Sequence, residues 1–551
     1  MYKQLFLSAA LFAASLQANA QSTATDYKGG NNNPISASVF CADPTALEYN
    51  GRLYVYGTND HQEFIKNGKK GDNSYGSIKS LVVFSTADMV NWTFHGTIDA
   101  QKLCATWTGN PWYKGFMNSW APSVTWRTNP DTGKDEFFLY FANTSHGVGV
   151  LTADSPTGPW KSPLKESLIN KDTPGALQQS ANFDPGVVID DNGTGWLTFG
   201  GLDPDKGGTN FMPNNTRIIK LQPSMTATDG EAILIPAPYH FEANELNYIN
   251  GTYVYTYNND WSDHTPWTWG GEKPTVCSMT YFTSKTPLVT DSWTYGGNYF
   301  KNPGENHLGY TNNHTHLHKY QGKWYIFYQT NLLEPLLGSN AGFRCIFVDE
   351  IEVDEKNVVI HECIPTRKGV SAIKNLNPYI VQYAATSSAT LGILYQQTDE
   401  AGRMVATVGT PCITAEMPTE GIIELRNAEF SGNANTLKCR LKGDGSVSLR
   451  LNDKDSADIM TITSTGDDWQ DRIATMTSSL SGTHTIYLIL KGNVQFDTWQ
   501  FVGDPMDGIN TLPSDKRQVE RIYDLQGHSL SSIPQGSPSL YIVNGKKQLF
   551  K

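Results

Sequence analysis

The run YNGRLYVY at residues 49–56 is the first of five similar stretches that decide the fold. Most of them join a turn signal such as Asn-Gly to a run of aromatic and β-branched residues, which is typical of a β-hairpin. Five such hairpins predict five small sheets, and radial repetition of small sheets gives a β-propeller. The other four stretches are DEFFLYF (135–141), NGTGWLTF (192–199), NGTYVYTY (250–257) and QGKWYIFY (321–328).

The repeated stretches place a propeller over residues 30–368, and a second unit follows it. Residues 370–503 contain short alternating runs such as SVSLRL (446–451), a pattern typical of a small β-sandwich. We therefore predict an all-β chain, with a five-bladed β-propeller followed by a β-sandwich (jelly-roll) module. A single large β-sandwich built from similar hairpins is the alternative to the propeller. The tail at 507–551 contains two further strand-like runs, which fit a hairpin or a small extra sheet.

The N-terminus, residues 1–20, has the pattern of a secretory signal peptide. Lys3 precedes an apolar stretch at 5–16, and Ala18 and Ala20 form a small-x-small cleavage pattern. No later segment approaches the roughly 20 apolar residues of a transmembrane helix. We therefore expect cleavage near Ala20 and a secreted, periplasmic or cell-surface protein with no membrane span.

Charge and cysteine content exclude several classes of function. The formal net charge is −12 and no long basic run occurs, so nucleic acid and anionic membrane surfaces are poor partners. The seven cysteines are scattered, without a CxxC or Cys/His cluster. Neither a zinc site nor a disulfide scaffold is indicated, although one or two disulfides fit an exported protein. We expect a monomer.

Three acidic residues lie beside repeated strands. Asp43 and Asp184 each precede a proline ahead of the first and third stretches, and Glu242 lies in Phe-Glu-Ala ahead of the fourth. Singly, each Asp-Pro is typical of a turn. In a propeller, however, the inner strands converge around the axis, so residues at their starts should gather at one end of the central channel.

Three carboxyl groups at one place fit a particular chemistry. Hydrolysis of a glycosidic bond needs one protonated carboxyl, which donates to the leaving oxygen, and one ionised carboxylate, which activates water or attacks carbon. A third carboxylate nearby raises the pKa of the acid by repulsion between like charges. The sequence therefore indicates a glycosidase.

From about residue 34 to 365, the chain resembles glycoside hydrolase family 43, an inverting family with a five-bladed propeller. The resemblance implies that Asp43 is the general base, Asp184 the pKa modulator and Glu242 the general acid. Base and acid would then lie roughly 6.5–9.5 Å apart with a water between them. The matching stretches, in order, are ADP (42–44), GRLYVY (51–56), DMVNW (88–92), WAPS (120–123), ADSPTGPW (153–160), DP (184–185), DDNG (190–193), FEA (241–243) and NGTY (250–253).

Weaker matches extend the expected site. His314, in Asn-Asn-His, resembles a histidine near the propeller axis that often lies beside calcium, whose shell would be mostly water; a simple hydrogen-bonded histidine is the alternative. Arg344 matches an arginine that approaches the sugar, and a guanidinium can bond two hydroxyls; the alternative is a surface ion pair. Trp120 is a candidate stacking platform for the sugar.

Two places leave alternatives open. Residues 244–245 read Asn-Glu where relatives often have Pro-Trp, which puts in doubt the aromatic wall near the acid and makes Glu245 a rival for its role. Three tryptophans, Trp261, Trp267 and Trp269, lie on a long loop after the fourth stretch. They could equally shape the cleft or pack the loop.

The second unit resembles a family 6 carbohydrate-binding module. Trp469 and Asn493 fall near the positions that contact glycan in such modules. The usual early Ala-Glu pair is replaced by Ala384 and Ala385, so one expected ligand is missing. Sugar binding and a spacer that merely packs on the propeller both remain open. The matching stretches are NPY (377–379), TGDDW (465–469), GTHTIYL (482–488), KG (491–492) and FDTWQF (496–501).

Together these features predict an exo-acting α-L-arabinofuranosidase that debranches arabinoxylan. A binding module favours a polymeric substrate, because tethering raises the local concentration of substrate. A β-xylosidase acting on xylo-oligosaccharides is the alternative on the same fold. A non-catalytic glycan-binding protein is the alternative from another class, but binding alone needs no carboxyl groups with separated pKa values.

Overall fold

The structure is a computed structural model. The expected signal peptide at 1–20 lies outside the described residues, as does most of the tail. The structure describes residues 28–68, 71–110, 114–178, 181–202, 211–397, 402–409 and 419–502, with strand residues 522–523, 529–530, 539–543 and 546–550.

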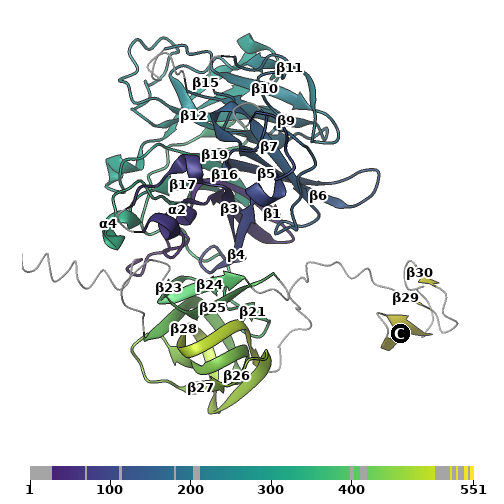
Figure 1. The fold of residues 1–551 in the computed structure, drawn as a ribbon, viewed down its shortest axis with the longest axis vertical. Helices are drawn as coiled ribbons and strands as arrows, with labels where there is room; N and C mark the ends of the chain where they lie inside the picture. Colours follow the sequence, from purple (N-terminus) through teal and green to yellow (C-terminus); the bar gives the residue numbers. More distant parts are fainter. Residues whose placement is uncertain are drawn as a thin grey trace, which may run out of the picture. The chain divides into compact units, whose positions relative to one another are not determined.

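Five antiparallel sheets follow one another along the chain and form the five blades of a propeller (Figure 1). Every repeated stretch of the sequence forms the second strand of a blade, so the predicted propeller is confirmed. The blades are β1 (Ala42–Tyr49), β2 (Arg52–Thr58), β3 (Ser80–Thr86) and β4 (Trp92–Asp99); β5 (Trp120–Thr128), β6 (Asp135–Ala142) and β7 (Val148–Ala153); β8 (Gly186–Ile189), β9 (Gly195–Gly200), β10 (Thr216–Leu221) and β11 (Thr228–Leu234); β12 (His240–Ile249), β13 (Thr252–Asn259), β14 (Met279–Ser284) and β15 (Thr294–Phe300); and β16 (Thr315–Tyr320), β17 (Lys323–Thr330) and β18 (Cys345–Glu350).

Short elements connect and edge the blades. They are the helices α2 (Asp60–Asn67), α3 (Ala100–Leu103) and α4 (Leu333–Leu337), the 3₁₀ turns η1 (Tyr75–Ser77), η2 (Thr144–His146), η3 (Thr290–Ser292) and η4 (Pro303–Asn306), and the hairpin of β19 (Val353–Asp354) with β20 (Val359–Ile360). The α2 helix and η1 both lie between β2 and β3, where they contribute to the site described below.

Local sequence explains why the hairpins form. Asn50 and Gly51 both have positive φ, 50° and 71°, as a two-residue hairpin turn with the twist of the flanking strands requires. The strands that follow such turns are buried on both faces between neighbouring blades, which explains their continuous apolar and aromatic runs. Buried tyrosines are accommodated in these strands because their hydroxyls form hydrogen bonds: Tyr56 donates to the carbonyl of Pro156 and Tyr140 to that of Met225.

The second unit folds as a nearly closed β-sandwich, which confirms the predicted fold class. Its two longest strands bend and pair along two segments, so that Leu437 lies opposite both Phe501 and Ala474. Its core is a separate apolar cluster that includes Trp499 and Phe496. The strands are β21 (Gln382–Tyr383), β22 (Thr386–Ser387), β23 (Ala389–Leu391), β24 (Ile393–Gln397), β25 (Met404–Val408), β26 (Glu420–Leu451), β27 (Met460–Ser464) and β28 (Gln470–Val502).

This module is joined to the first blade by backbone pairing. The strand β22 pairs with β4 and becomes the fifth strand of that blade. The Phe94 ring of β4 lies 5.7 Å from the ring of Tyr395, and Asn91 accepts the amide N–H of Arg426 at 2.9 Å. The buried Lys28 ammonium donates to the carbonyl of Ser388 at 2.7 Å. The first blade therefore continues into the module.

The chain divides into two compact units, 1–504 and 505–551. The described strands of the C-terminal unit form a small antiparallel sheet in the order β30-β29-β31-β32. Its strands are β29 (Ile522–Tyr523), β30 (Ser529–Leu530), β31 (Ser539–Val543) and β32 (Lys546–Phe550).

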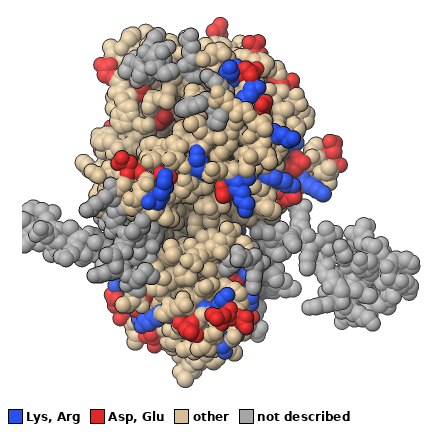
Figure 2. All heavy atoms as spheres, viewed as in Figure 1, with Lys and Arg blue, Asp and Glu red and all other residues tan. Residues whose placement is uncertain are grey.

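Acidic and basic side chains are interspersed on the face of the molecule that Figure 2 shows. The six cysteines within the described ranges are buried and free. Among the helices of the described part of the chain, none has the length and apolar character to cross a membrane.

The pairing of β22 with β4 predicts that the propeller depends on the module for stability. A chain ending at residue 368 would leave the edge of β4 unpaired and would uncover Phe94, at a cost of about 2 kcal/mol for each uncovered aromatic side chain. Its thermal unfolding midpoint, followed by circular dichroism, should fall below that of the propeller in the full chain. An unchanged midpoint would contradict this dependence.

Candidate active site

The inner strands share a sharp bend at the end that carries the predicted acids. Asp43, Ala121, Asp184 and Ala243 have φ values of 50°, 35°, 48° and 62°, a region that non-glycine residues enter rarely and at an energetic cost. The strand ladders of β1, β5 and β12 are irregular at the same places. Such bulges re-aim side chains. Asp43 and Asp184 occupy the bend itself, whereas Glu242 lies one residue before it.

Hydrogen bonds to side chains of neighbouring blades hold these bends. The amide N–H of Asp43 donates to Gln329 Oε1 at 2.7 Å, across from the first blade to the fifth. The amide N–H of Ala243, in the fourth blade, donates to Asp184 Oδ2 at 2.9 Å. The strained strand starts are therefore fixed around the channel axis by contacts between blades.

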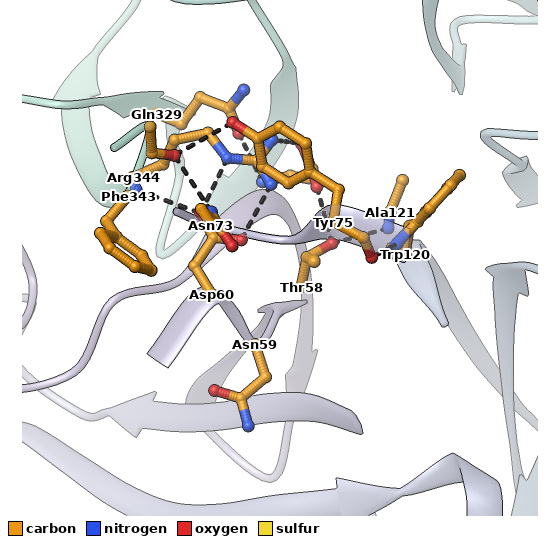
Figure 3. A network of polar contacts seen from close by, with 12 residues as sticks. Thr58, Asn59, Asp60, Asn73, Tyr75, Trp120, Ala121, Gln329, Phe343 and Arg344 are labelled. Atoms are coloured by element: carbon orange, nitrogen blue, oxygen red, sulfur yellow. Dashed lines mark hydrogen bonds and ion pairs between the residues drawn. The ribbon is translucent and has the colours of Figure 1, made fainter. Parts of the chain in front are cut away.

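Asp43 is held at both carboxylate oxygens by Thr58 and Arg344, which Figure 3 labels. Thr58 Oγ1 donates to Oδ2 at 2.6 Å, and Arg344 Nη1 donates to Oδ1 at 2.8 Å. The same guanidinium donates through Nε and Nη2 to the two oxygens of Asp60, each at 2.9 Å, and lies 5.0 Å from the ring centroid of Tyr75. Each carboxylate oxygen of Asp43 therefore accepts one hydrogen bond, and one of the two donors is a cation.

Asp184 and Glu242 form a coupled acidic pair. Burial, with the charges of Glu242 and Asp43, raises the pKa of Asp184 well above its usual value, against the amide hydrogen bond at its Oδ2. Burial and the charge of Asp43 raise the pKa of Glu242 to about 7, while Arg344 and a hydrogen bond with Asn312 oppose the rise. At neutral pH the pair therefore holds a proton. Glu242 is partly exposed, whereas Asp184 is buried.

The three predicted acids are thus brought together in two different states. One carboxylate, Asp43, accepts hydrogen bonds from an arginine and a hydroxyl. Another, Glu242, has its pKa raised to about 7 by burial and the charge of Asp43, and it is partly exposed. An ionised base and a protonated acid are the two groups that water-mediated cleavage of an acetal requires.

His314 lies against this cluster as a neutral side chain. Its Nδ1 is 3.5 Å from Asp43 Oδ1, and burial lowers its pKa to about 4 despite the opposing charge of Asp43. Within the described ranges, no three His, Cys, Asp or Glu side chains converge as a metal-binding group. The calcium expected beside His314 stays a prediction.

Glu245, the other candidate for the general acid, is buried between the blades of the propeller. It is 1% exposed, and its Oε1 is 3.0 Å from Nδ1 of the buried His316. The backbones of Gly186 and Glu245 pack closely, because a Cβ added at Gly186 would lie 2.6 Å from the Glu245 Cα. Only glycine fits at position 186. This placement favours Glu242 over Glu245 as the group that meets substrate.

Aromatic side chains border the site on the side of the base. The half-buried Trp120 donates its indole N–H to the carbonyl of Tyr75 at 2.8 Å. Tyr75, in η1, is 43% exposed, and its ring lies over the guanidinium of Arg344. The two residues lie side by side near Arg344, the partner of Asp43, and form an aromatic rim there (Figure 3).

The three tryptophans of the fourth-blade loop differ in their surroundings. Trp261 is 45% exposed, and its indole N–H donates to Asn312 Oδ1 at 3.1 Å; Asn312 also hydrogen-bonds to Glu242. The rings of Trp267 and Trp269 pack edge-on against aromatic rings of the same blade, at 4.9 and 5.1 Å. Trp261 thus lies beside the acid, whereas the other two pack the loop.

The two candidate contacts of the module are placed by the structure, but their role stays a prediction. Trp469 is half-buried, and the guanidinium of Arg440 lies 5.7 Å from its ring centroid. Asn493 is exposed and lies opposite Asp444 in the ladder of β26 and β28.

Four residues around Asp43 escaped the sequence reasoning: Thr58, Asp60, Tyr75 and Gln329. A signal existed for three of them, because polar residues directly follow two of the repeated aromatic runs, in GTND (57–60) and at Gln329. Those runs are the second strands of the first and fifth blades, which end near the site. Tyr75 lies on a connection and carries no such signal.

Comparison with known proteins agrees with this geometry. The family model of glycosyl hydrolases family 43 matches residues 31–357. An arabinoxylan arabinofuranohydrolase of Bacillus subtilis (strain 168) is 36% identical over 490 residues, covering 86% of this chain and 92% of that protein. One from Paenibacillus polymyxa is 32% identical over 526 residues, covering 92% of this chain and 80% of its own.

A crystal structure supports the same relationship. A family 43 arabinoxylan arabinofuranohydrolase from Bacillus subtilis, in complex with cellotetraose, matches with a TM-score of 0.75 at 31% identity. The match covers 86% of this chain and 98% of that one. It extends beyond residue 357 and so includes part of the module as well as the propeller.

Asn244 should be a structural support of the site. This buried amide donates to the carbonyls of Asp184 and Gly200 at 2.9 and 2.7 Å and accepts from the hydroxyl of Tyr255. Asn244→Ala leaves these groups unpaired and should destabilise the fold by about 2–4 kcal/mol, measured as a lower midpoint of urea unfolding. The half-buried Asn247, with one hydrogen bond to a carbonyl, is the matched control. Equal losses in Asn244→Ala and Asn247→Ala would contradict the assignment.

Proposed function

Because this chain belongs to glycosyl hydrolases family 43, we propose that it releases terminal α-L-arabinofuranosyl groups from arabinoxylan. The observation that carries the chemistry is the pairing of Asp43, clamped by Arg344, with Glu242, whose pKa is raised to about 7. The two arabinoxylan arabinofuranohydrolases at 36% and 32% identity support the choice of substrate.

In this proposal Asp43 is the general base. Its ionised carboxylate takes a proton from a water molecule, and the water oxygen attacks the anomeric carbon of the sugar. Thr58 and Arg344 occupy one oxygen each, which fixes the plane of the carboxylate. The reaction inverts the anomeric configuration, because the water approaches from the face opposite the leaving group.

Glu242 is the general acid in the same proposal. It donates its proton to the glycosidic oxygen as the bond to the anomeric carbon breaks. Asp184 acts as the pKa modulator: it lies close enough to couple with Glu242, and its amide partner Ala243 fixes it beside the acid. The partial exposure of Glu242 leaves it accessible to a substrate.

The accessible aromatic rings, of which Tyr75 and Trp261 are exposed and Trp120 is half-buried, support a polymeric substrate. Tyr75 and Trp120 border the site on the side of Asp43, where the arabinofuranosyl group would bind. Arg344 uses three of its five N–H groups in bonds to Asp60 and Asp43, which leaves two for hydroxyls of that sugar. Trp261 is linked to Glu242 through Asn312, and in this proposal it provides the platform on the leaving-group side, where a xylan backbone would bind. Aromatic rings suit the apolar faces of sugar rings.

The remaining proposals concern the rest of the chain. We infer export through the signal peptide at 1–20, and a family 6 type of carbohydrate-binding role for the module, with Trp469 and Asn493 as its contacts. The cation–π contact of Arg440 covers part of Trp469, so a glycan would meet the remaining surface of that ring. Calcium, if bound, would contact His314 and be held mainly by water.

Activity on model substrates tests the proposal directly. The purified chain should hydrolyse p-nitrophenyl α-L-arabinofuranoside and release arabinose from wheat arabinoxylan, and Glu242→Gln should abolish release from arabinoxylan. Faster hydrolysis of p-nitrophenyl β-xyloside would instead establish the β-xylosidase alternative. Absence of hydrolysis of every pentoside would overturn the proposal and favour a glycan-binding protein.

Trp261 should matter for the polymer and not for a small substrate. Trp261→Ala removes a platform on the leaving-group side, so KM for arabinoxylan should rise by about 10-fold or more, equivalent to about 1.4 kcal/mol. The kinetic constants for p-nitrophenyl α-L-arabinofuranoside should change little. Trp267→Ala, on the same loop but packed against the blade, is the control. Equal effects of the two variants on arabinoxylan would contradict the role of Trp261.

A further inference from the structure

We propose that Asp60 is a positioning residue: it fixes the guanidinium of Arg344, and through it the carboxylate of Asp43. The inference rests on the proposed function, in which Asp43 is the general base. Asp60 itself lies behind Arg344 and contacts neither Glu242 nor the aromatic rim among the hydrogen bonds of the described residues. Its role would therefore be exerted entirely through the arginine.

The contact between Asp60 and Arg344 is a bidentate fork. Asp60 Oδ2 accepts Arg344 Nε at 2.9 Å and Oδ1 accepts Nη2 at 2.9 Å. Oδ2 also accepts the backbone N–H of the same arginine at 3.1 Å. A guanidinium and a carboxylate joined by two parallel bonds share a plane, so Asp60 sets the orientation of the whole group.

That orientation decides where the third nitrogen points. With Nε and Nη2 bound to Asp60, Nη1 faces Asp43 and donates to its Oδ1 at 2.8 Å. Tyr75 lies over the guanidinium, 5.0 Å away, and limits movement out of the plane. If Asp60 could no longer accept these bonds, the guanidinium would be free to turn both of its terminal nitrogens towards Asp43. The carboxylate of the base would then lose its present plane.

The scaffold around Asp60 is itself well anchored. Asp60 is the first residue of α2, it is 0% exposed, and Phe64 of the same helix packs at 5.1 Å against Phe343, the residue before Arg344. Glu334 Oε1 accepts the amide N–H of Phe343 at 2.8 Å. The backbone on the N-terminal side of Arg344 is thus held by Glu334 and Phe64, while Asp60 binds both the amide N–H and the guanidinium of the arginine.

Stability alone explains the buried Asp60 poorly. Burial raises the pKa of Asp60, and the charge and hydrogen bonds of Arg344 oppose the rise. Buried ion pairs often contribute little net stability compared with apolar residues of similar volume. Asp60 also adds a negative charge close to Asp43, and the two share Arg344. A role in orienting Arg344 explains why a carboxylate is present at position 60, where packing alone does not require one.

The isosteric variant Asp60→Asn tests the inference. Asparagine keeps the shape but replaces one acceptor oxygen by a donor, so the fork to Arg344 cannot form. On p-nitrophenyl α-L-arabinofuranoside, kcat should fall by about 10- to 100-fold, while KM should change by less than about threefold. Arg344→Lys, which keeps the charge and loses the fork, should lower kcat to a similar extent. An unchanged kcat in Asp60→Asn would overturn the proposal.

A matched control separates positioning from general destabilisation. Asp190 is likewise buried and accepts hydrogen bonds, from Trp196 and Tyr253, but lies outside the site. Asp190→Asn should lower the unfolding midpoint and leave kcat of the folded enzyme within about twofold of the wild type. A fall in kcat as large as that of Asp60→Asn would show that loss of a buried carboxylate suffices, and would contradict a positioning role.

A double-mutant cycle and a crystal structure complete the test. If Asp60 acts only through Arg344, adding Asp60→Asn to Arg344→Gln should lower kcat no further; full additivity would overturn the proposal. In a crystal structure of Asp60→Asn, the Nη1 contact with Asp43 should be lost or rearranged, and its retention would be contrary evidence. The structural readout needs no substrate, so it separates failure of this inference from failure of the proposed function.

Discussion

The site depends on one cation shared by two carboxylates. Arg344 binds Asp60 through a fork and Asp43 through its remaining terminal nitrogen, and it is the only cation hydrogen-bonded to the acids of this site in the described part of the chain. Its charge also opposes the rise in the pKa of Glu242, but burial and the charge of Asp43 outweigh it. The pKa of Glu242 is therefore raised to about 7, as a proton donor requires.

The propeller provides the geometry for this separation of charge. Inner strands of successive blades start at the same end of the channel, and four of them bend there through a strained residue with positive φ. Amide hydrogen bonds between blades hold those bends: Gln329 of the fifth blade accepts from Asp43 of the first, and Asp184 accepts from Ala243 of the fourth. The contacts that close the ring of blades are thus the same contacts that orient the acids.

Local features of the sequence predicted the fold, but contacts between residues far apart in the sequence could not be predicted. Most of the five hairpins were readable because a turn pair such as Asn-Gly and its strand are adjacent in sequence, and Asp43 and Asp184 stood out beside them. The one-residue offset of Glu242 was not predictable, since it follows from a bulge. Nor was the partner of Arg344, because Asp60 is separated from it by 284 residues. Whether Trp261 or Trp267 faces the site likewise depended on packing that spacing does not encode.

The central claim is that Glu242 acts as the proton donor because its surroundings raise its pKa to about 7. The pH dependence of kcat/KM for arabinoxylan tests it most directly, because that ratio reports the ionisations of the free enzyme. Burial and the charge of Asp43 raise the pKa of Glu242 to about 7, so the acid is present below that pH and lost above it. The account predicts that kcat/KM falls about tenfold per pH unit above pH 7. A value that stays constant up to about pH 9 would contradict it.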